Sequence, residues 1–231
     1  MDNIFYDRYS FSQIHIYTHE ILCDLIRDNS KKSNQNSEHK ASCFHIITDA
    51  SAKIKTGVFP FAFADVRIST DIIAPDGKIV ARKDNSRKIN HGQPFEQNFL
   101  INAPSLWSPE TPYLYKAVSK IYVDGKQTDE YTTRFGIRSI EIIADKGFFL
   151  NGKHRKFQGV CNHHDLGPLG AAVNVAALRR QLTLLKDMGC DAVRTSHNMP
   201  TPELVELCDE MGFMMMLEPF DEWDIAKCEN G

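Results

Sequence analysis

The sequence predicts an antiparallel β-sandwich followed by the start of a parallel α/β domain. Two observations support this fold class. Residues 51–143 contain short stretches of β-branched side chains that are separated by turns and show no helical period, which is typical of an antiparallel sandwich. Residues 147–217 instead alternate strand-like and helix-like segments, which predicts right-handed crossovers and a parallel sheet.

Length and composition are those of an ordinary globular protein. The chain has 231 residues, of which 42% are hydrophobic and 25% are charged. Its formal net charge of −3 argues against a nucleic-acid partner, which would require a basic patch. No apolar run approaches the roughly 18 residues of a membrane span. The N-terminus mixes charges into its apolar residues and lacks the apolar core of a signal peptide. The six cysteines form no CxxC pair, so we expect free thiols rather than disulfides.

The first 45 residues give no readable fold. Residues 28–42 are polar, unpatterned and nearly free of apolar side chains, which predicts a flexible linker or an exposed loop. We therefore expect residues 1–45 to form an unassigned N-terminal remnant and a polar linker.

The middle of the chain has the pattern of strands joined by turns. Residues 66–73 are rich in β-branched side chains and run into Pro75-Asp76-Gly77, where proline fixes φ and glycine accepts a positive φ. Residues 114–123 and 127–134 flank Asp124-Gly125, which is a strong hairpin signal. A non-catalytic structural or binding module is the simplest interpretation of this region.

The last third of the chain alternates helix and strand signals. Asn174 is a good N-cap for a helix with one apolar face that stops at Gly189. Residues 190–195 have the pattern of a strand, and Thr201 caps a second helix with proline at its first position. Residues 213–217 are a continuous apolar run, as expected of a parallel strand that is covered on both faces.

Polar side chains follow each expected strand of this parallel sheet. The carboxyl ends of parallel strands open on one face, where substrates bind. We therefore expect a cluster there of imidazoles, carboxylates and one guanidinium. Its members are His163, His164 and Asp165 in the first loop, Arg194, Ser196, His197 and Asn198 at the second strand, and Glu218, Asp221, Glu222 and Asp224 after the third.

These side chains allow three chemical interpretations and one structural interpretation. A polyol or sugar pocket with carboxylate acid/base chemistry fits the mixture of groups best. A metal site could use His163 or His164, Asp165, His197 and a carboxylate, although no HxH or HExxH spacing is present. A Ser196–His197 nucleophilic pair is disfavoured, because neighbours on an extended segment point to opposite sides. In the structural interpretation, the arginine and one histidine only hold buried strand ends together.

Four sequence motifs resemble glycoside hydrolase family 2, the group of β-galactosidases and β-glucuronidases. The family signature is similar to RTSHNMPTPELVELCDEMGF at residues 194–213, followed by EPFDEW at residues 218–223. The G-x-N-x-H segment of the family resembles residues 159–163, in which Cys161 takes the place of the usual asparagine. Residues 107–115 resemble the end of the family's immunoglobulin-like domain, and residues 134–138 resemble the strand that leads into its barrel.

The resemblance implies an immunoglobulin-like β-sandwich over residues 46–145 and the N-terminal portion of a (β/α)8 TIM barrel over residues 146–231. A sugar-binding jelly-roll domain would be missing or reduced. In the family, the acid/base glutamate follows the fourth barrel strand and the nucleophilic glutamate follows a later one. We therefore expect this chain to be a fragment that contains neither catalytic residue and is inactive alone.

For the complete parent, the resemblance implies a β-galactosidase-like hydrolase of carbohydrate metabolism. It would cleave β-glycosidic bonds with retention, through a glycosyl-enzyme intermediate. The residues that the resemblance places at the sugar are His163, His164, Arg194, His197, Asn198 and Glu218. Glu222 and Asp224 fall on the metal-binding Glu and His of some β-galactosidases, and the aspartate departs from that pattern.

Cofactor, partner and compartment follow as expectations. We expect no required cofactor, apart from magnesium as an option in a complete parent. The expected partner is a β-linked saccharide, without nucleic acid or membrane, and the parent is free to form oligomers. By family, the compartment would be the bacterial cytoplasm or periplasm. The alternative function is a non-catalytic carbohydrate-binding or structural β-sandwich module.

Overall fold

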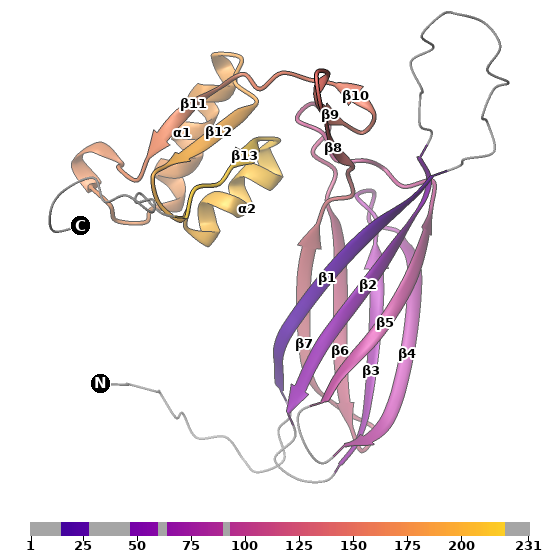
Figure 1. Ribbon diagram of the computed structural model, residues 1–231. Coiled ribbons are helices and arrows are strands. Elements are labelled where there is room, and N and C mark those ends of the chain that lie inside the picture. The colour runs from indigo at the N-terminus through magenta and orange to yellow at the C-terminus, as the bar shows by residue number, and fades with distance from the viewer. Residues whose placement is uncertain (1–14, 28–46, 60–63, 90–92, 220–231) are drawn as a thin grey trace, which may run out of the picture. The chain divides into compact units, whose positions relative to one another are not determined.

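The computed structural model describes residues 15–27, 47–59, 64–89 and 93–219 (Figure 1). The linker expected at residues 28–42 lies outside the described residues. The chain forms two compact units. The first contains Met1–Ser105 and Tyr115–Ile137, and the second contains Leu106–Leu114 and Arg138–Gly231. The short segment Leu106–Leu114 therefore belongs to the second unit, although sandwich strands flank it in the sequence.

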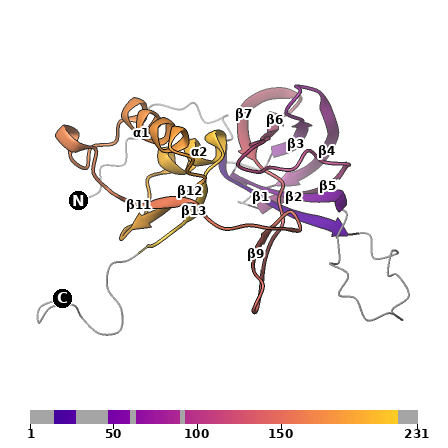
Figure 2. The ribbon, with the colours of Figure 1, turned by 90° about the horizontal axis from the view of Figure 1, so that it is seen from above.

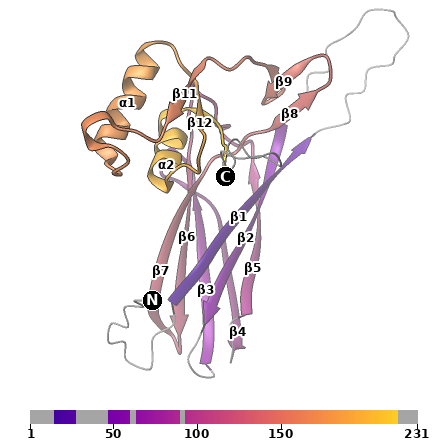
Figure 3. The same cartoon turned by 60° about the vertical axis from the view of Figure 1, so that its left-hand side comes forward.

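The first unit is a sandwich of two antiparallel sheets. One sheet has the order β1-β2-β5, formed by His15–Arg27, Ile47–Phe59 and Gln93–Asn102. The other has the order β4-β3-β6-β7, formed by Ile79–Ile89, Ala64–Ile73, Tyr115–Val123 and Lys126–Phe135. Figures 2 and 3 show these two sheets as facing layers. Strand β1 lies in the region to which the sequence assigned no fold.

The core of the sandwich follows from residue alternation along its strands. In β3, every second side chain is buried, because successive residues of a strand point to opposite faces. One buried cluster contains Val66, Ile68, Ile89, Phe95 and Ile121. The predicted hairpin is confirmed, because β6 and β7 pair through the turn at Asp124 and Gly125, both with positive φ.

The second unit begins with a small antiparallel meander and continues as a parallel sheet. The meander is formed by β8 (Ile140–Ile143), β9 (Gly147–Leu150) and β10 (Lys153–His154). The parallel sheet has the order β11-β12-β13, formed by Gly159–His163, Ala192–Ser196 and Met214–Met216. Two helices, α1 (Val175–Asp187) and α2 (Pro202–Met211), lie on one side of it (Figure 2). The predicted order of strands and helices is confirmed.

Both helices begin and end where the sequence predicts. The Asn174 side chain accepts a hydrogen bond from the Ala177 amide, and the Thr201 hydroxyl accepts one from the Leu204 amide. Gly212 ends α2 in the left-handed conformation, with φ of 74°. The helices bury their apolar faces on the sheet in a cluster of Leu178, Leu182, Val193, Leu204, Leu207, Cys208 and Phe213.

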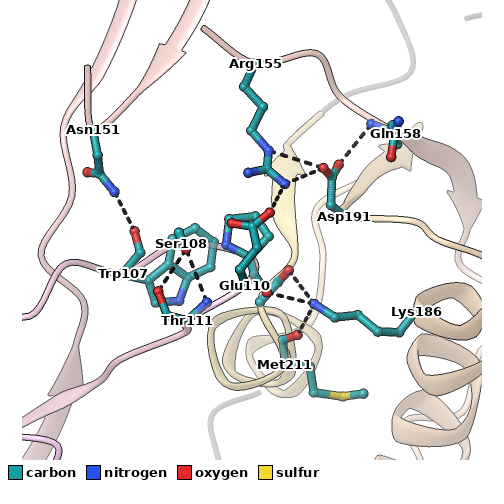
Figure 4. A network of polar contacts seen from close by, with 12 residues as sticks. Trp107, Ser108, Glu110, Thr111, Asn151, Arg155, Gln158, Lys186, Asp191 and Met211 are labelled. Atoms are coloured by element: carbon teal, nitrogen blue, oxygen red, sulfur yellow. Dashed lines mark hydrogen bonds and ion pairs between the residues drawn. The ribbon is translucent and has the colours of Figure 1, made fainter. Parts of the chain in front are cut away.

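A polar network closes the amino-terminal end of this sheet (Figure 4). Arg155 donates hydrogen bonds to Asp191, with 2.7 Å between Nη2 and Oδ2, and to Glu110, with 2.6 Å between Nη2 and Oε1. The second carboxylate oxygen of Asp191 accepts from the Gln158 amide at 2.9 Å. Asp191 is buried, so the guanidinium compensates a charge that would be costly without a partner.

The segment Leu106–Leu114 completes this closed end. The Lys186 ammonium donates to the carbonyl oxygens of Pro109 and Met211, both at 2.9 Å (Figure 4). The buried Trp107 indole donates to the Asp209 carbonyl at 2.8 Å. Gly212 allows this close packing, because a Cβ atom there would lie 2.4 Å from the Pro109 carbonyl oxygen. The segment therefore packs at the amino-terminal end of the sheet and does not cover the carboxyl ends of the strands.

Candidate functional site

The parallel register determines which side chains meet at the carboxyl ends of the strands. Cys161 of β11 pairs with Arg194 of β12, and His163 pairs with Ser196. Because alternate side chains of a strand share a face, these four residues lie on one face of the sheet. Val193, one residue before Arg194, packs among the helices. The four residues therefore lie on the face that looks away from α1 and α2.

Glu218 joins two of the predicted site residues. One oxygen of its carboxylate accepts from Nε of Arg194 at 2.5 Å, and the other lies 2.6 Å from Nδ1 of His197. Its backbone amide donates to the Thr195 hydroxyl at 2.8 Å, which fixes the residue beside β12. The bond to His197 and the Arg194 guanidinium hold the pKa of the Glu218 carboxyl below its usual range. Glu218 is therefore ionised at neutral pH.

His163 completes this cluster from the neighbouring strand. Its ring lies perpendicular to that of His197, with 6.0 Å between the ring centroids. Both rings are exposed, and Arg194 and Glu218 are partly exposed. The structure thus brings together four of the predicted site residues, in an arrangement that a solute can reach. We call His163, Arg194, His197 and Glu218 the strand-end cluster.

The other two predicted residues, His164 and Asn198, lie in a pocket beside this cluster. The pocket has a volume of about 420 Å³, including space open to solvent. It lies at the starts of α1 and α2, and His163 lines it as well. Further lining residues include Asp165, Leu178, Gln181 and Leu204. Sequence reasoning missed Gln181, because a single glutamine within a helix carries no signal of a pocket.

The remaining chemical interpretations gain nothing from the structure. Ser196 and His197 are joined by a cis peptide bond, and the Ser196 hydroxyl has no hydrogen-bond partner among the described residues. It therefore shows no contact with a catalytic base. The described part of the chain contains no group of three or more His, Cys, Asp or Glu residues that could hold a metal ion. Glu222 and Asp224, the expected metal residues, lie outside the described residues.

Cys161 is a member of the site region that sequence reasoning did not select. Nη1 of Arg194 donates to its sulfur at 3.4 Å. The guanidinium therefore contacts Cys161 with one nitrogen and Glu218 with others. A glycine two residues earlier makes this close pairing of β11 and β12 possible, because a Cβ atom on Gly159 would lie 2.1 Å from the Ala192 carbonyl oxygen.

Over the described residues, no helix is long and apolar enough to cross a membrane.

Comparison with known proteins links both units to one family. The family model "Glycosyl hydrolases family 2" matches residues 44–138, and its "TIM barrel domain" model matches residues 141–225. The chain is 46% identical over 161 residues to the β-galactosidase BoGH2A of Bacteroides ovatus, which covers 69% of this chain and 19% of that protein. It is 32% identical over 162 residues to a β-glucuronidase of Bacteroides fragilis, which covers 68% of this chain and 23% of that one.

Solved structures show the same likeness. A glycosyl hydrolase family 2 member from Bacteroides cellulosilyticus matches with a TM-score of 0.77 and 29% identity, over 94% of this chain and 26% of that one. A β-glycosidase from Bacteroides vulgatus matches with a TM-score of 0.76 and 31% identity, over 93% of this chain and 25% of that one. The predicted fold class, an immunoglobulin-like sandwich followed by the first part of a TIM barrel, is confirmed. The chain spans about a fifth of the length of the curated relatives that it matches, and it belongs to glycosyl hydrolase family 2.

Proposed function

We propose that this protein takes part in the hydrolysis of β-glycosidic bonds with retention, and that the strand-end cluster binds the sugar. The observation that carries the proposal is the Glu218 carboxylate, which bridges Arg194 and His197 at the carboxyl ends of the parallel strands. Active sites of TIM-barrel enzymes lie at this end. The names of the relatives, β-galactosidase and β-glucuronidase, support a β-linked saccharide as the substrate.

The cluster has the chemistry that sugar hydroxyls require. Imidazole, guanidinium and carboxylate groups together supply both donors and acceptors of hydrogen bonds. Because Nδ1 of His197 is held by Glu218, Nε2 is the ring nitrogen that remains for a hydroxyl. The ion pair between Arg194 and Glu218 fixes that carboxylate before a sugar arrives. Less rotational freedom is then lost on binding, which favours affinity.

Glu218 acts as a positioning residue in this proposal rather than as the catalytic acid. A general acid in glycoside hydrolysis needs a raised pKa, whereas the pKa of Glu218 is lowered by its two partners. Retention also needs a second carboxylate about 5 Å away, across the glycosidic bond. We expect both catalytic glutamates after barrel strands later than β13.

A chimeric enzyme tests the proposal. The segment of the Bacteroides ovatus β-galactosidase that corresponds to residues 159–218 is replaced by this chain's residues, and hydrolysis of a nitrophenyl β-galactoside is measured. His163→Ala and His197→Ala should each lower kcat/KM on the order of a hundredfold, because each removes a hydrogen bond that strengthens as charge develops. The thermal midpoint should stay unchanged, since both rings are exposed.

His154→Ala is the matched control in the full 231-residue chain, because His154 is also an exposed histidine but lies on β10, away from the cluster. Binding of galactose to that chain, followed by NMR, should weaken in His163→Ala and His197→Ala and persist in His154→Ala. A chimera that binds galactose but hydrolyses nothing would favour the alternative of a non-catalytic carbohydrate-binding module. Unchanged kcat/KM in both histidine variants, with lowered thermal midpoints, would assign the two rings to packing and overturn the sugar site.

A further inference from the structure

The thiol of Cys161 lies in an unusual chemical setting. Cys161 is exposed, and the strand register places it opposite Arg194. Nε and Nη2 of that guanidinium contact Glu218, whereas Nη1 donates to the Cys161 sulfur at 3.4 Å. A permanent positive charge therefore stands beside an accessible sulfur atom, which favours the thiolate over the thiol.

Ser196 supplies a second, independent observation. It is only 2% exposed, and its hydroxyl has no hydrogen-bond partner among the described residues. A buried hydroxyl without a partner is uncommon in folded proteins. It lies on β12, on the same face of the sheet as Arg194 and Cys161. The Arg194 guanidinium lowers the pKa of the Cys161 thiol, although the Glu218 charge opposes it.

Cys208 and Cys190, whose side chains are also described, lack this setting. Cys208 is buried in the helix cluster, and burial raises the pKa of its thiol to about 12. Cys190 is half-buried and packs against the same cluster. Cys208 and Cys190 therefore serve as internal references, and the reactivity of Cys161 can be measured relative to theirs.

We propose that Cys161 is a site of covalent modification by soft electrophiles, namely α,β-unsaturated carbonyl compounds and haloacetamides. The thiolate sulfur attacks the β-carbon of the unsaturated compound and forms an S–C bond. The π electrons of the C=C bond move to the α-carbon, which takes a proton from water. With iodoacetamide, the sulfur displaces iodide from the methylene carbon. Arg194 stabilises the attacking thiolate, and the Ser196 hydroxyl, unpaired among the described residues, is then available to donate to it.

Modification would also change the strand-end cluster. An adduct on the sulfur occupies the space in front of Arg194 and removes the hydrogen bond from Nη1. This consequence, that modification blocks saccharide binding, rests on the proposed function. The reactivity itself does not, because it is measured in the absence of any saccharide. If the strand-end cluster does not bind a sugar, Cys161 can still be the modified residue, and the reverse also holds.

Alkylation of the full 231-residue chain by iodoacetamide tests the proposal, with mass spectrometry of the peptide that carries each cysteine. We expect Cys161 to react much faster than Cys208 and faster than Cys190 at pH 7, and acrylamide to give the same order. Arg194→Gln should slow Cys161 by about threefold and move its pH profile to higher pH, since fewer thiolates are present although each is more nucleophilic. Glu218→Gln should accelerate it, because a neighbouring negative charge is lost.

Arg179→Gln is the matched control, because it removes an exposed arginine of α1 that pairs with Glu210. It should leave the Cys161 rate unchanged. The Cys208 rate in each variant reports unfolding, and Ser196→Ala provides a second variant with a smaller expected loss. Equal Cys161 rates in the Arg194→Gln and Arg179→Gln variants would overturn the proposal. So would a Cys161 rate in the unaltered chain that is no higher than that of Cys190.

Discussion

The two ends of the β11-β12-β13 sheet use the same charged groups in opposite ways. At the amino-terminal end, Arg155 pairs with Asp191, and their side chains are 22% and 12% exposed. At the carboxyl end, Arg194 pairs with Glu218, and their side chains are 39% and 23% exposed. Arg155 of the first pair also donates a hydrogen bond to Glu110 of the segment Leu106–Leu114. Glu218 of the second pair instead contacts the exposed His197.

With the proposed function, this difference separates stability from sugar binding within one small sheet. A buried charge that loses its partner leaves a desolvated ion, which is strongly destabilising, whereas an accessible charge regains water. In TIM barrels, the amino-terminal face of the strands serves stability and the carboxyl face serves chemistry. With the proposed function, the two roles can coexist because the segment that packs at one end does not reach the other. The following substitutions test that separation.

The same substitution at the two ends should give the largest contrast. Arg155→Gln should lower the free energy of unfolding by about 3 kcal/mol, because Asp191 would remain buried without its cation. Arg194→Gln should cost less than about 1 kcal/mol, since Glu218 is closer to water and keeps His197. Urea denaturation followed by the fluorescence of buried Trp107 measures both, in a Trp223→Phe background that leaves one tryptophan. Similar losses at both ends would contradict the comparison.

Substitutions at two glycines with positive φ test whether the segment Leu106–Leu114 constrains the end of α2. Gly212→Ala should cost about 2 to 4 kcal/mol, because the new Cβ atom would meet the Pro109 carbonyl as well as strain the backbone. Gly189→Ala should cost only about 1 kcal/mol, because nothing lies within 4 Å of its Cβ position. The difference between the two urea midpoints isolates the contact with the segment. An equal cost would mean that the segment does not constrain the end of α2.

At the carboxyl end of the sheet, substitution of Glu218 should affect the hydrolysis of the sugar substrate and not the stability of the fold. Glu218→Gln should lower kcat/KM of the chimeric enzyme about tenfold or more, because the neutral amide holds Arg194 and His197 less firmly. The thermal midpoint should shift by less than about 3 °C, the range expected for the loss of a largely accessible ion pair. A large drop in the thermal midpoint with unchanged kcat/KM would place Glu218 among the residues that stabilise the fold.

The smallest effect is a pH dependence at the closed end. The hydrogen bond from Arg155 is the main cause that lowers the pKa of Glu110 to about 2. A carboxylate with a lowered pKa stabilises the folded state fully above its unfolded pKa of about 4.3, and that stability is lost as the pH falls toward 2. Because Glu110 is 61% exposed, we expect Glu110→Gln to cost less than about 1 kcal/mol at pH 7.

Urea midpoints of the Glu110→Gln variant and the unaltered chain, measured between pH 7 and pH 2.5, give the readout for this last prediction. The gap between the two proteins should close as the pH falls. A gap that stays constant over this range would show that the carboxylate form of Glu110 is not what Arg155 stabilises.

Local sequence signals determined the elements of this protein. Asn174 and Thr201 mark the starts of α1 and α2 because their side chains satisfy the first free amides of each helix, a purely local requirement. The turn at Asp124 and Gly125 likewise determines the hairpin of β6 and β7. The strand-end position of His163, Arg194 and His197 also followed from the sequence, since strand order and family motifs both lead to it.

Only the tertiary structure decided which distant residues meet. The indole of Trp107 donates to Asp209, 102 residues away in the sequence, so a segment that looked like part of the sandwich packs with the second unit. Register between β11 and β12 brought Cys161 to Arg194, and the path of the chain after β13 brought Glu218 to His197. Such contacts depend on how strands align and how loops return. No local pattern encodes them, because their energy comes from burial and charge compensation between segments that are far apart in the sequence.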